Sequence, residues 1–244
     1  MTASHDVSEH ATAEHQFATE GYAVIPDAIS DLVLAEVIAK LASLSEGRAG
    51  SRRLLDARWC ADLGTSINTD RRFQAFLPVA ARAVQCTLFE KSSSKNWLVT
   101  PHQDLSIPVA RRVPSSACRG WSEKEGEVFV QPPLEVLSQL TAVRLHLDDC
   151  DEDNGALRVL PGSHLLGRLS SREVLETRGR VRECAVSVSR RAALVLKPLL
   201  VHASSKSTSD RPRRVLHFVF GPAKLPDGLD WPNRKSGLTF GVVC

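Results

Sequence analysis

The feature that most constrains the fold is a series of short β-like runs from residue 97 onward, separated by Gly, Pro, Asp, Asn and Ser. Short apolar runs bounded by these turn residues are typical of β-strands. Helix-like patterns precede them, so the sequence predicts a mainly β core with N-terminal helices packed outside it. The runs lie at residues 97–100, 141–147, 157–160, 184–188, 193–196 and 214–220.

The helix-like patterns lie in the first third of the chain. Residues 21–26 predict a short strand closed by proline, and Ser30 is suited to cap the helix that follows. That helix has apolar residues at positions 34, 37, 38 and 41, which is helical spacing. A second helix is predicted over residues 73–86, with an interruption at Pro78.

The opening residues 1–15 are polar and lack an apolar period, which predicts a disordered tail. Its histidines, His5, His10 and His15, are therefore expected to be solvated, and we assign them no function. Residues 16–244 are expected to form a single domain, because all-β domains commonly reach this length.

Composition bears on the partners and the compartment. The chain has 31 Lys and Arg residues against 28 Asp and Glu, a net charge of +3 that is too balanced to favour nucleic acid or an anionic membrane. A small molecule is the better expected partner. The six cysteines lack CxxC spacing and suit a reducing compartment. Because there is no apolar run of ~18 residues and no basic-then-apolar leader, we expect a cytoplasmic location.

A long connection at about residues 107–137 interrupts the rhythm of short strands. It contains Arg, Pro, Gly and Trp residues with little periodicity. Long irregular loops in compact domains are often active-site lids, and an ordinary surface excursion fits the pattern equally well. Both interpretations stay open, and Arg111 and Arg112 could meet an anionic group or face water.

The sharpest local feature is His102-Gln103-Asp104, which follows one of the β-like runs. In an extended segment, residues i and i+2 point to one face, so His102 and Asp104 can bind one ion together. Alone the motif is weak, because a His-x-Asp arises by chance in roughly a third of such chains. The pair needs a further ligand.

A second histidine and an arginine supply further candidates. His202 closes a long apolar run, where a strand meets a loop. Two imidazoles and one carboxylate form the facial triad of non-haem Fe(II) oxygenases, whereas zinc prefers a closed site or one open position. Beyond it, strand alternation places Arg213 and His217 on one face. A guanidinium carried inward needs an anionic partner, for which a dicarboxylate is suited.

These segments resemble the phytanoyl-CoA dioxygenase family of Fe(II)/2-oxoglutarate oxygenases. The resemblance spans about residues 15–222 and rests on residues 17–26, on His102-Gln-Asp104, on the Asn-Gly and Pro-Gly-Ser-His groups within residues 147–164, and on His202 followed eleven residues later by Arg213. It implies a double-stranded β-helix core, that is, a jelly-roll or cupin-like fold. The Asn154-Gly155 and Pro161-Gly162 pairs are themselves expected to be structural turns.

The resemblance also implies a site. Fe(II) would be held by His102, Asp104 and His202, and the distal carboxylate of 2-oxoglutarate would be bound by Arg213. Ser204 stands where the family often supplies a hydroxyl to the same carboxylate.

Two cosubstrate positions differ among relatives. Arg144 stands where many relatives carry a tryptophan that lines the cosubstrate pocket, and it is expected to share a strand face with His146 and Asp148. Lys91 falls where some relatives place a basic residue near the cosubstrate. Whether Lys91 and Arg144 contact 2-oxoglutarate or the substrate stays open. His146 and His217 could contact substrate, but a histidine on an inward strand face is more often simply hydrogen-bonded in place, which is the expectation for both.

By this resemblance the chain is expected to be an Fe(II)/2-oxoglutarate-dependent dioxygenase, with O2 as the second cosubstrate. It would hydroxylate, desaturate or cyclise at a C–H bond of a small organic metabolite. Related halogenases lack a carboxylate at the position of Asp104, so its presence disfavours halogenation. Two alternatives stay open, a non-catalytic β-helix module that binds or senses a ligand and an oxygenase with a protein substrate. The sequence leaves the oligomeric state open.

Overall fold

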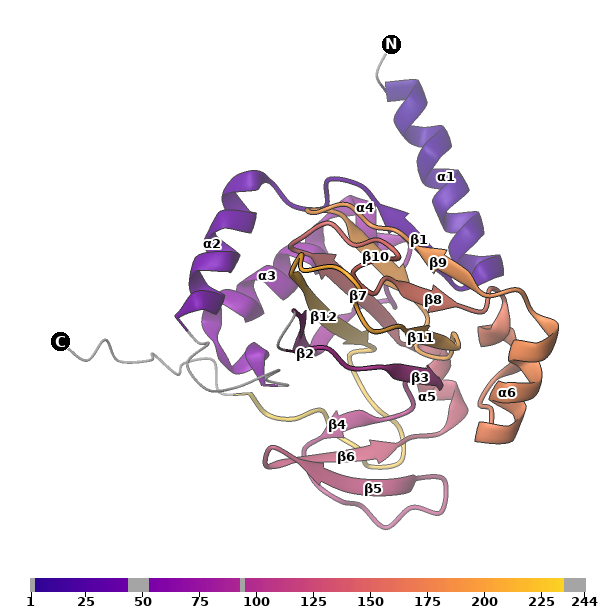
Figure 1. Ribbon diagram of the computed structural model, residues 1–244. Helices are drawn as coiled ribbons and strands as arrows, with labels where there is room; N and C mark the ends of the chain where they lie inside the picture. The colour runs from indigo at the N-terminus through magenta and orange to yellow at the C-terminus, as the bar shows by residue number, and fades with distance from the viewer. Residues whose placement is uncertain (1–2, 44–52, 93–94, 235–244) are drawn as a thin grey trace.

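The computed structural model describes residues 3–43, 53–92 and 95–234. Residues 1 and 2 of the predicted tail, and the predicted end of the domain with Cys244, lie outside these ranges. The described strands form two larger antiparallel sheets and a smaller third one (Figure 1). The five-stranded sheet has the order β1 (Tyr22–Ile25), β10 (Ala193–Leu196), β7 (Thr141–His146), β12 (Arg213–Gly221) and β2 (Arg82–Lys91). The four-stranded sheet has the order β3 (Val99–His102), β11 (His202–Ser204), β8 (Leu157–Val159) and β9 (Cys184–Val186).

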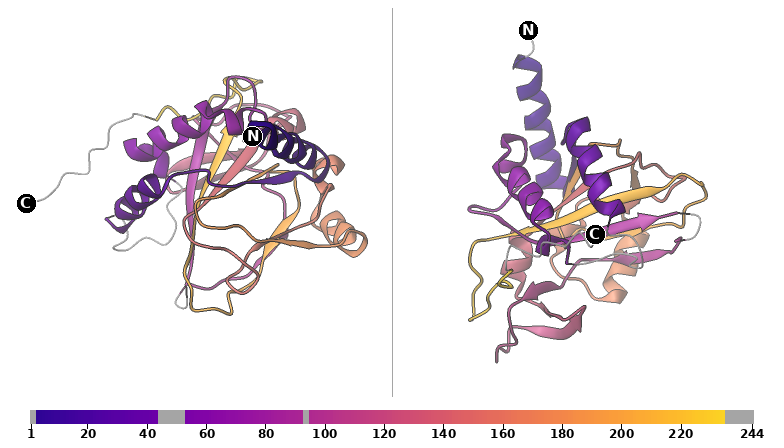
Figure 2. Two further views of the ribbon diagram at one scale, coloured as in Figure 1. Left: turned by 90° about the horizontal axis from the view of Figure 1, so that it is seen from above. Right: turned by 90° about the vertical axis from the view of Figure 1, so that its left-hand side faces the viewer.

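The two larger sheets pack face to face around an apolar layer. Because side chains alternate between the faces of a strand, Ala142 and Leu194 of the five-stranded sheet point inward and meet Leu157 and Val159 of the four-stranded sheet. Figure 2 shows the N-terminal helices gathered on one side of the strands. The prediction of a mainly β, jelly-roll core with N-terminal helices outside is confirmed.

The N-terminal helices cover the outer face of the five-stranded sheet. Leu34 and Ile67, from two of these helices, share one apolar cluster with Val143 and Phe218 of the strands. Ser30 caps its helix as predicted, because its hydroxyl accepts a hydrogen bond of 3.3 Å from the Val33 N–H. The N-terminal helices are α1 (Ala3–Glu20), α2 (Asp31–Ala42), η1 (Leu54–Asp56), α3 (Arg58–Thr69) and α4 (Arg71–Gln74), and α5 (Leu134–Gln139), η2 (Ser163–Leu166) and α6 (Ser171–Arg180) follow later. None of the helices described is both long and apolar enough to cross a membrane.

The structure corrects the helix predicted over residues 73–86. Helix α4 ends at Gln74, and β2 begins at Arg82. Strand β2 pairs with β12 along its whole length, from Lys91 opposite Arg213 to Arg82 opposite Gly221. The cross-strand ladder therefore outweighs the helical spacing of a few apolar residues.

The first residues also differ from the sequence-based expectation. Helix α1 begins at Ala3, where the sequence predicts a disordered tail. It contains neither glycine nor proline, and the buried Phe17 anchors its last turns in the core. His15 is exposed, and His5 and His10 lie outside the residues whose side chains are described.

The segment at residues 107–137 is not irregular, contrary to expectation. Strands β4 (Ile107–Val109), β6 (Glu127–Gln131) and β5 (Arg119–Lys124) form the third antiparallel sheet, which lies below the larger sheets in Figure 1. The β5–β6 hairpin turns at Glu125 and Gly126, which both have positive φ, 53° and 76°. Because β5 is largely exposed, its sequence has no apolar alternation that would indicate a strand. We call this three-stranded sheet the insertion sheet.

Candidate active site

Three side chains that can bind a metal meet where β3 and β11 lie side by side. His102 and His202 are partners in this antiparallel ladder, and Asp104 follows the end of β3 by two residues. Asp104 Oδ1 lies 3.6 Å from His102 Nε2, and Asp104 Oδ2 lies 3.6 Å from His202 Nε2. One ligand atom from each side chain lies within 4.8 Å of the other two. A single ion can therefore contact all three predicted ligands.

Backbone carbonyls orient both imidazoles. His102 Nδ1 lies 2.8 Å from the carbonyl oxygen of Thr100, and His202 Nδ1 lies 2.9 Å from that of Leu200. With a proton on each Nδ1, the Nε2 lone pairs are free, as is usual for metal-binding histidines. Two imidazoles and one carboxylate leave coordination positions open, which is typical of non-haem iron sites.

Electrostatic interactions favour the metal-binding forms of Asp104 and His202. For His102, burial lowers the pKa, but the hydrogen bond with Asp104 and the Asp104 charge raise it more, so that without a metal the pKa lies above its ordinary value. Burial raises the pKa of Asp104, but the neighbouring His202, His102 and His217 lower it more. The pKa of Asp104 therefore lies below its ordinary value. Burial lowers the pKa of His202 to about 4, although Asp104 opposes this shift. An ionised carboxylate and a neutral imidazole are the forms that bind metal ions.

Three buried cations lie on neighbouring strands of the five-stranded sheet. Arg213 on β12 pairs with Lys91 on β2, and β7 on the other side of β12 carries Arg144. Their exposed fractions are only 3%, 0% and 6%, respectively. The ion pairs among the described residues involve none of the three. Burial, with the nearby Arg213 as a second cause, lowers the pKa of Lys91 to about 8 and that of Arg144 to about 10.

Neutral oxygen atoms hold two of these cations in place. Lys91 Nζ donates a hydrogen bond of 2.7 Å to Ser204 Oγ and another to the carbonyl oxygen of Ser205. Arg213 Nη1 donates a hydrogen bond of 2.6 Å to the Gly155 carbonyl, which also accepts one of 2.9 Å from the Ser204 hydroxyl. The four predicted cosubstrate residues, Lys91, Arg144, Ser204 and Arg213, are thus brought into one region of the molecule.

Several polar atoms in this region have no partner. Arg144 Nε, Arg213 Nε and both ring nitrogens of His146 are buried without a hydrogen bond among the described residues. Buried donors without acceptors are rare, and buried cations without counterions are costly. The donor set therefore fits an acidic ligand bound next to the metal-binding triad.

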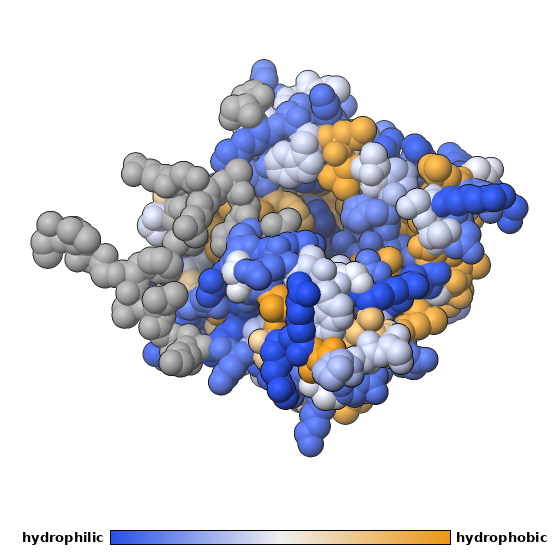
Figure 3. Space-filling view, turned by 90° about the horizontal axis from the view of Figure 1, so that it is seen from below, coloured by the Kyte–Doolittle hydropathy of each residue, from blue (hydrophilic) through white to orange (hydrophobic). Residues whose placement is uncertain are grey.

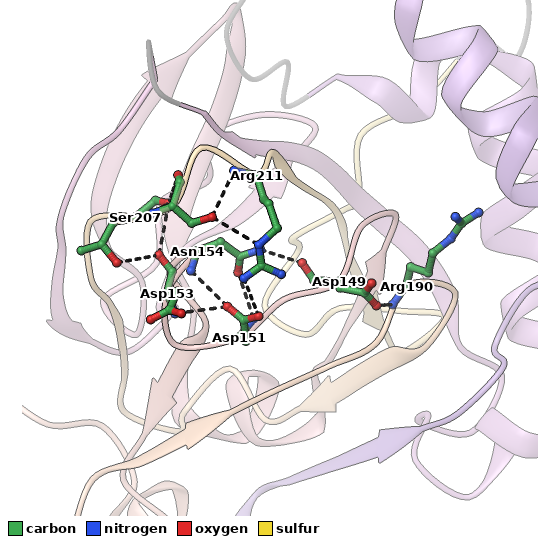
Figure 4. Close-up of polar contacts among 9 residues, drawn as sticks. Asp149, Asp151, Asp153, Asn154, Arg190, Ser207 and Arg211 are labelled. Carbon is green, nitrogen blue, oxygen red and sulfur yellow. Dashed lines mark hydrogen bonds and ion pairs between the residues drawn. The ribbon is translucent and has the colours of Figure 1, made fainter.

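The Asn154-Gly155 turn supports the cation region, and Figure 4 shows its contacts. The Asp151 N–H donates to Asn154 Oδ1 at 2.9 Å, and the Asn154 N–H donates to Asp151 Oδ1 at 3.3 Å. Arg211 pairs with Asp151 at 2.7 Å and ties this turn to the segment that leads into β12. Gly155 has a φ of +85°, and a Cβ on it would lie only 2.9 Å from the Ser205 carbonyl oxygen. The predicted turn is confirmed, and its glycine permits the close approach of backbone to the cations.

A cavity of about 280 Å³ lies beside Asp104 and His217. Strands β2 and β12 line one side, and Lys124 and Phe129 of the insertion sheet line another. Seen from below in Figure 3, the molecule presents mostly hydrophilic residues with scattered apolar ones between them. The insertion sheet therefore forms one wall of this cavity, and its movement as a lid stays a prediction.

His217 is hydrogen-bonded in place, as expected, and it also lies next to the triad. Its Nε2 lies 3.9 Å from Asp104 Oδ2, and its Nδ1 lies 3.3 Å from Arg144 Nη1. The strand alternation that carries Arg213 inward was the signal that could have identified it. Asp148, by contrast, does not share the inner face of Arg144, because β7 ends before it and Asp148 forms an ion pair of 2.7 Å with Arg214.

Comparison with known proteins gives a family and several similar structures. The model of the family described as phytanoyl-CoA dioxygenase (PhyH) matches residues 17–215. No curated protein sequence matches the chain.

Among solved structures, the epimerase SnoN from nogalamycin biosynthesis, in complex with Fe3+, alpha ketoglutarate and nogalamycin RO, is 16% identical with a TM-score of 0.67, over 96% of this chain and 97% of SnoN. HygX from Streptomyces hygroscopicus, with nickel and 2-oxoglutarate bound, is 17% identical with a TM-score of 0.58, over 87% and 86% of the two chains. AviO1 from Streptomyces viridochromogenes Tue57 is 18% identical with a TM-score of 0.58, over 89% and 97%. At these identities the likeness shows a shared fold.

Proposed function

The chain belongs to the phytanoyl-CoA dioxygenase family, and from that premise we propose that it is an Fe(II)- and 2-oxoglutarate-dependent dioxygenase that uses O2. The proposed reaction hydroxylates, or alternatively desaturates or cyclises, at a C–H bond of a small organic metabolite and releases succinate and CO2. The observation that carries the proposal is a set of buried, unpaired cations on the inner sheet face, close to a His-Asp-His triad.

In this proposal His102, Asp104 and His202 hold Fe(II). When bound, the iron supplies the activation of dioxygen that no amino-acid side chain provides. The protein would contribute the orientation of the ligands, because the Thr100 and Leu200 carbonyls hold both Nδ1 atoms and leave both Nε2 atoms free for an ion. The carboxylate of Asp104 would take a coordination position that a halide needs, so we propose hydroxylation-type chemistry rather than halogenation.

The cations receive 2-oxoglutarate. We assign its distal carboxylate to Arg213, whose planar guanidinium can donate two parallel hydrogen bonds. Ser204 and Lys91 lie beside Arg213 and supply a hydroxyl and a second charge. Arg144 lies on the side of the triad, because its guanidinium contacts His217, which is next to Asp104.

The substrate is assigned to the cavity beside Asp104. Its volume of about 280 Å³ suits a small molecule rather than a folded protein segment. The near-neutral net charge of +3 gives no reason to invoke nucleic acid or a membrane surface. We also propose a cytoplasmic location, which suits the five described cysteines, all of them free.

Anaerobic titration of the full-length protein with Fe(II) and then 2-oxoglutarate tests the proposal. We expect a weak visible charge-transfer band, because the cosubstrate can chelate the ion only through open coordination positions. The matched control is His202→Ala, in which the band should be lost. Admission of O2 together with a panel of small metabolites should then produce succinate. Absence of the band contradicts the proposal, and a band without O2-dependent succinate indicates the non-catalytic binding module.

A further inference from the structure

The ring of His217 is fixed from three sides on the inner face of the five-stranded sheet. It lies opposite Arg144 on β7 and opposite Thr87 on β2. The Phe89 ring packs edge-on against it, with ring centroids 5.5 Å apart, and Arg144 covers the same Phe89 ring at 5.3 Å. The His217 side chain is only 6% exposed. Its orientation is therefore set by neighbours rather than by solvent.

The contact with Arg144 determines which ring nitrogen carries the proton. Arg144 Nη1 lies 3.3 Å from His217 Nδ1. A guanidinium has donors and no acceptor, so Nδ1 must accept this hydrogen bond and cannot itself carry a hydrogen. In a neutral imidazole the hydrogen is then on Nε2. Arg144 thus selects the tautomer of His217.

His217 Nε2 faces Asp104, which lines the same cavity. Its nearest carboxylate oxygen, Asp104 Oδ2, lies 3.9 Å away, which is too far for a hydrogen bond. His217 is one of the residues that line the cavity of about 280 Å³. The N–H group is therefore available to a ligand that occupies the cavity beside the metal-binding triad.

Other polar groups that line the cavity can also donate hydrogen bonds or carry positive charge. The Thr87 hydroxyl oxygen accepts a hydrogen bond of 3.1 Å from Gln85 Nε2, which leaves its O–H free to donate. Lys124 contributes a cation at the insertion sheet. Of the lining residues in the described part of the chain, only Asp104 is a carboxylate, and it belongs to the triad. Besides neutral amide and hydroxyl oxygens, the cavity thus offers N–H and O–H donors and the positive charge of Lys124, and its only carboxylate among the described lining residues is that of the triad.

We propose that Arg144 and His217 form a dyad that presents the His217 Nε2–H as a fixed donor to an oxygen atom of the substrate. The inference rests on the proposed function and names the substrate class, which is a small neutral or anionic molecule with a hydroxyl, carbonyl or carboxylate oxygen close to the C–H bond that reacts. Molecules of the same shape that carry an ammonium group in place of the oxygen are disfavoured, since the ammonium group has no acceptor and is repelled by Lys124 at the cavity and by Arg144, which contacts the far side of His217. His217 is a specificity-determining residue and Arg144 is its positioning residue.

The tautomer is measured first, without turnover. Full-length protein with ¹⁵N-labelled histidine is loaded with Zn(II) in place of iron, and long-range ¹H–¹⁵N spectra are recorded. The signals of His217 are assigned by their loss in His217→Gln. In the wild type we expect the Nε2–H tautomer alone. In Arg144→Met this tautomer should no longer be the only form. An Nδ1–H tautomer in the wild type, or an unchanged tautomer in Arg144→Met, overturns the dyad.

The substrate class is measured next with probes of one skeleton. Cyclohexanol, cyclohexanone, cyclohexanecarboxylate and cyclohexylammonium are titrated into the anaerobic Fe(II)–2-oxoglutarate protein, and binding is read from the shift of the charge-transfer band. We expect the oxygenated probes to bind at least about fivefold more tightly than the ammonium probe, as one hydrogen bond provides. The preference should disappear in His217→Phe, which keeps the ring, and persist in His217→Gln, which keeps an N–H donor. Equal binding of all four probes, or no binding of any, overturns the assignment.

The two experiments separate this inference from the proposed function. If the charge-transfer band never forms, the oxygenase proposal fails, and the Zn(II) spectra still decide whether the dyad exists. If the band forms, O2-dependent succinate is produced and the probes show no preference, the oxygenase proposal stands and the substrate class is wrong.

Discussion

Arg213 lies directly opposite Lys91 across the β12–β2 ladder, although both side chains are buried cations. Like charges in opposite positions of a sheet destabilise it, and the ion pairs among the described residues include neither of them. The fold therefore carries an electrostatic cost that an anionic ligand would relieve. This relationship identifies Arg213 and Lys91 as the most informative positions for tests of cosubstrate binding.

Replacing Arg213 with lysine should weaken 2-oxoglutarate binding while the charge is kept. Lysine lacks the planar fork of arginine, so at least one charge-assisted hydrogen bond is lost. A loss of ~1.5 to 3 kcal/mol corresponds to about tenfold or more in the 2-oxoglutarate concentration required. The measurement is the 2-oxoglutarate dependence of succinate release.

The matched control is Arg214→Lys, one residue further along β12. Arg214 points to the opposite side and pairs with Asp148 at 2.7 Å, so its replacement should leave the 2-oxoglutarate dependence unchanged. If Arg213→Lys behaves like this control, the distal carboxylate binds elsewhere and Arg144 becomes the better candidate.

The affinity for 2-oxoglutarate should fall as the pH rises through about 8. Burial and the nearby Arg213 lower the pKa of Lys91 to about 8, so the free protein loses this charge well below the ordinary range of lysine. Above that pH, binding of the carboxylate must take up a proton, and the dissociation constant should rise by up to about tenfold per pH unit. Calorimetric titration between about pH 7 and about pH 9 measures it.

Lys91→Met supplies the control for this pH dependence. It should bind 2-oxoglutarate more weakly at neutral pH and show a flat profile, because the titrating charge is gone. A profile that falls equally in the wild type and in Lys91→Met would assign the pH dependence to another group.

Loss of one metal ligand should abolish turnover without unfolding the protein. His202→Ala removes the imidazole that faces Asp104 at 3.6 Å, while the apolar layer between the sheets stays in place. We expect no Fe(II)-dependent succinate and a circular dichroism spectrum like that of the wild type. His15→Ala, on the exposed surface of α1, should retain full activity. Succinate formation by His202→Ala at the wild-type rate would exclude the triad.

A methyl group on Gly155 should damage both stability and cosubstrate binding. Its φ of +85° is strained for alanine, and the added Cβ would lie 2.9 Å from the Ser205 carbonyl oxygen and 3.1 Å from Lys91 Nζ. The backbone strain alone costs roughly 1 kcal/mol. The clash adds to this cost and displaces the carbonyl that holds Arg213. Thermal unfolding and 2-oxoglutarate titration of Gly155→Ala measure the two effects.

Gly228→Ala separates strain from the clash. Gly228 has a similar φ of +72° and no atom within 4 Å of the added Cβ. It should lose only the strain energy and keep normal 2-oxoglutarate binding. Equal losses in the two variants would mean that the close approach of Gly155 to the cations is unimportant.

The inner residues of β12 could be predicted from the sequence because strand alternation is a local property. Arg213 and His217 lie on the predicted face, and His102 with Asp104 follow the i, i+2 rule. His202 was identified from its place at a strand end and from the family resemblance rather than from any local spacing to Asp104.

Other features depend on contacts between distant residues and could not be predicted. The hydrogen bond between Arg144 and His217 joins strands 73 residues apart, so nothing in either segment indicates the tautomer of the imidazole. Strand β2 was missed because its ladder with β12, rather than its own spacing of apolar residues, makes it a strand. The exposed β5 has no apolar face to show its period.

The insertion sheet should close over the occupied cavity and become resistant to protease. Lys124 and Phe129 line the cavity from this sheet, and the segment between β4 and β5 carries Arg111 and Arg112 on its exposed surface. Closure over bound ligands excludes water and orders such segments. Trypsin should therefore cut near Arg111 and Arg112 rapidly in the metal-free protein and more slowly once Fe(II), 2-oxoglutarate and a binding probe are present under anaerobic conditions.

Cleavage at Arg180, which is exposed at the end of α6 and does not line the cavity, serves as the internal control and should not change. If both sites are cut at the same rate with and without ligands, the insertion sheet is a fixed wall of the cavity and not a lid.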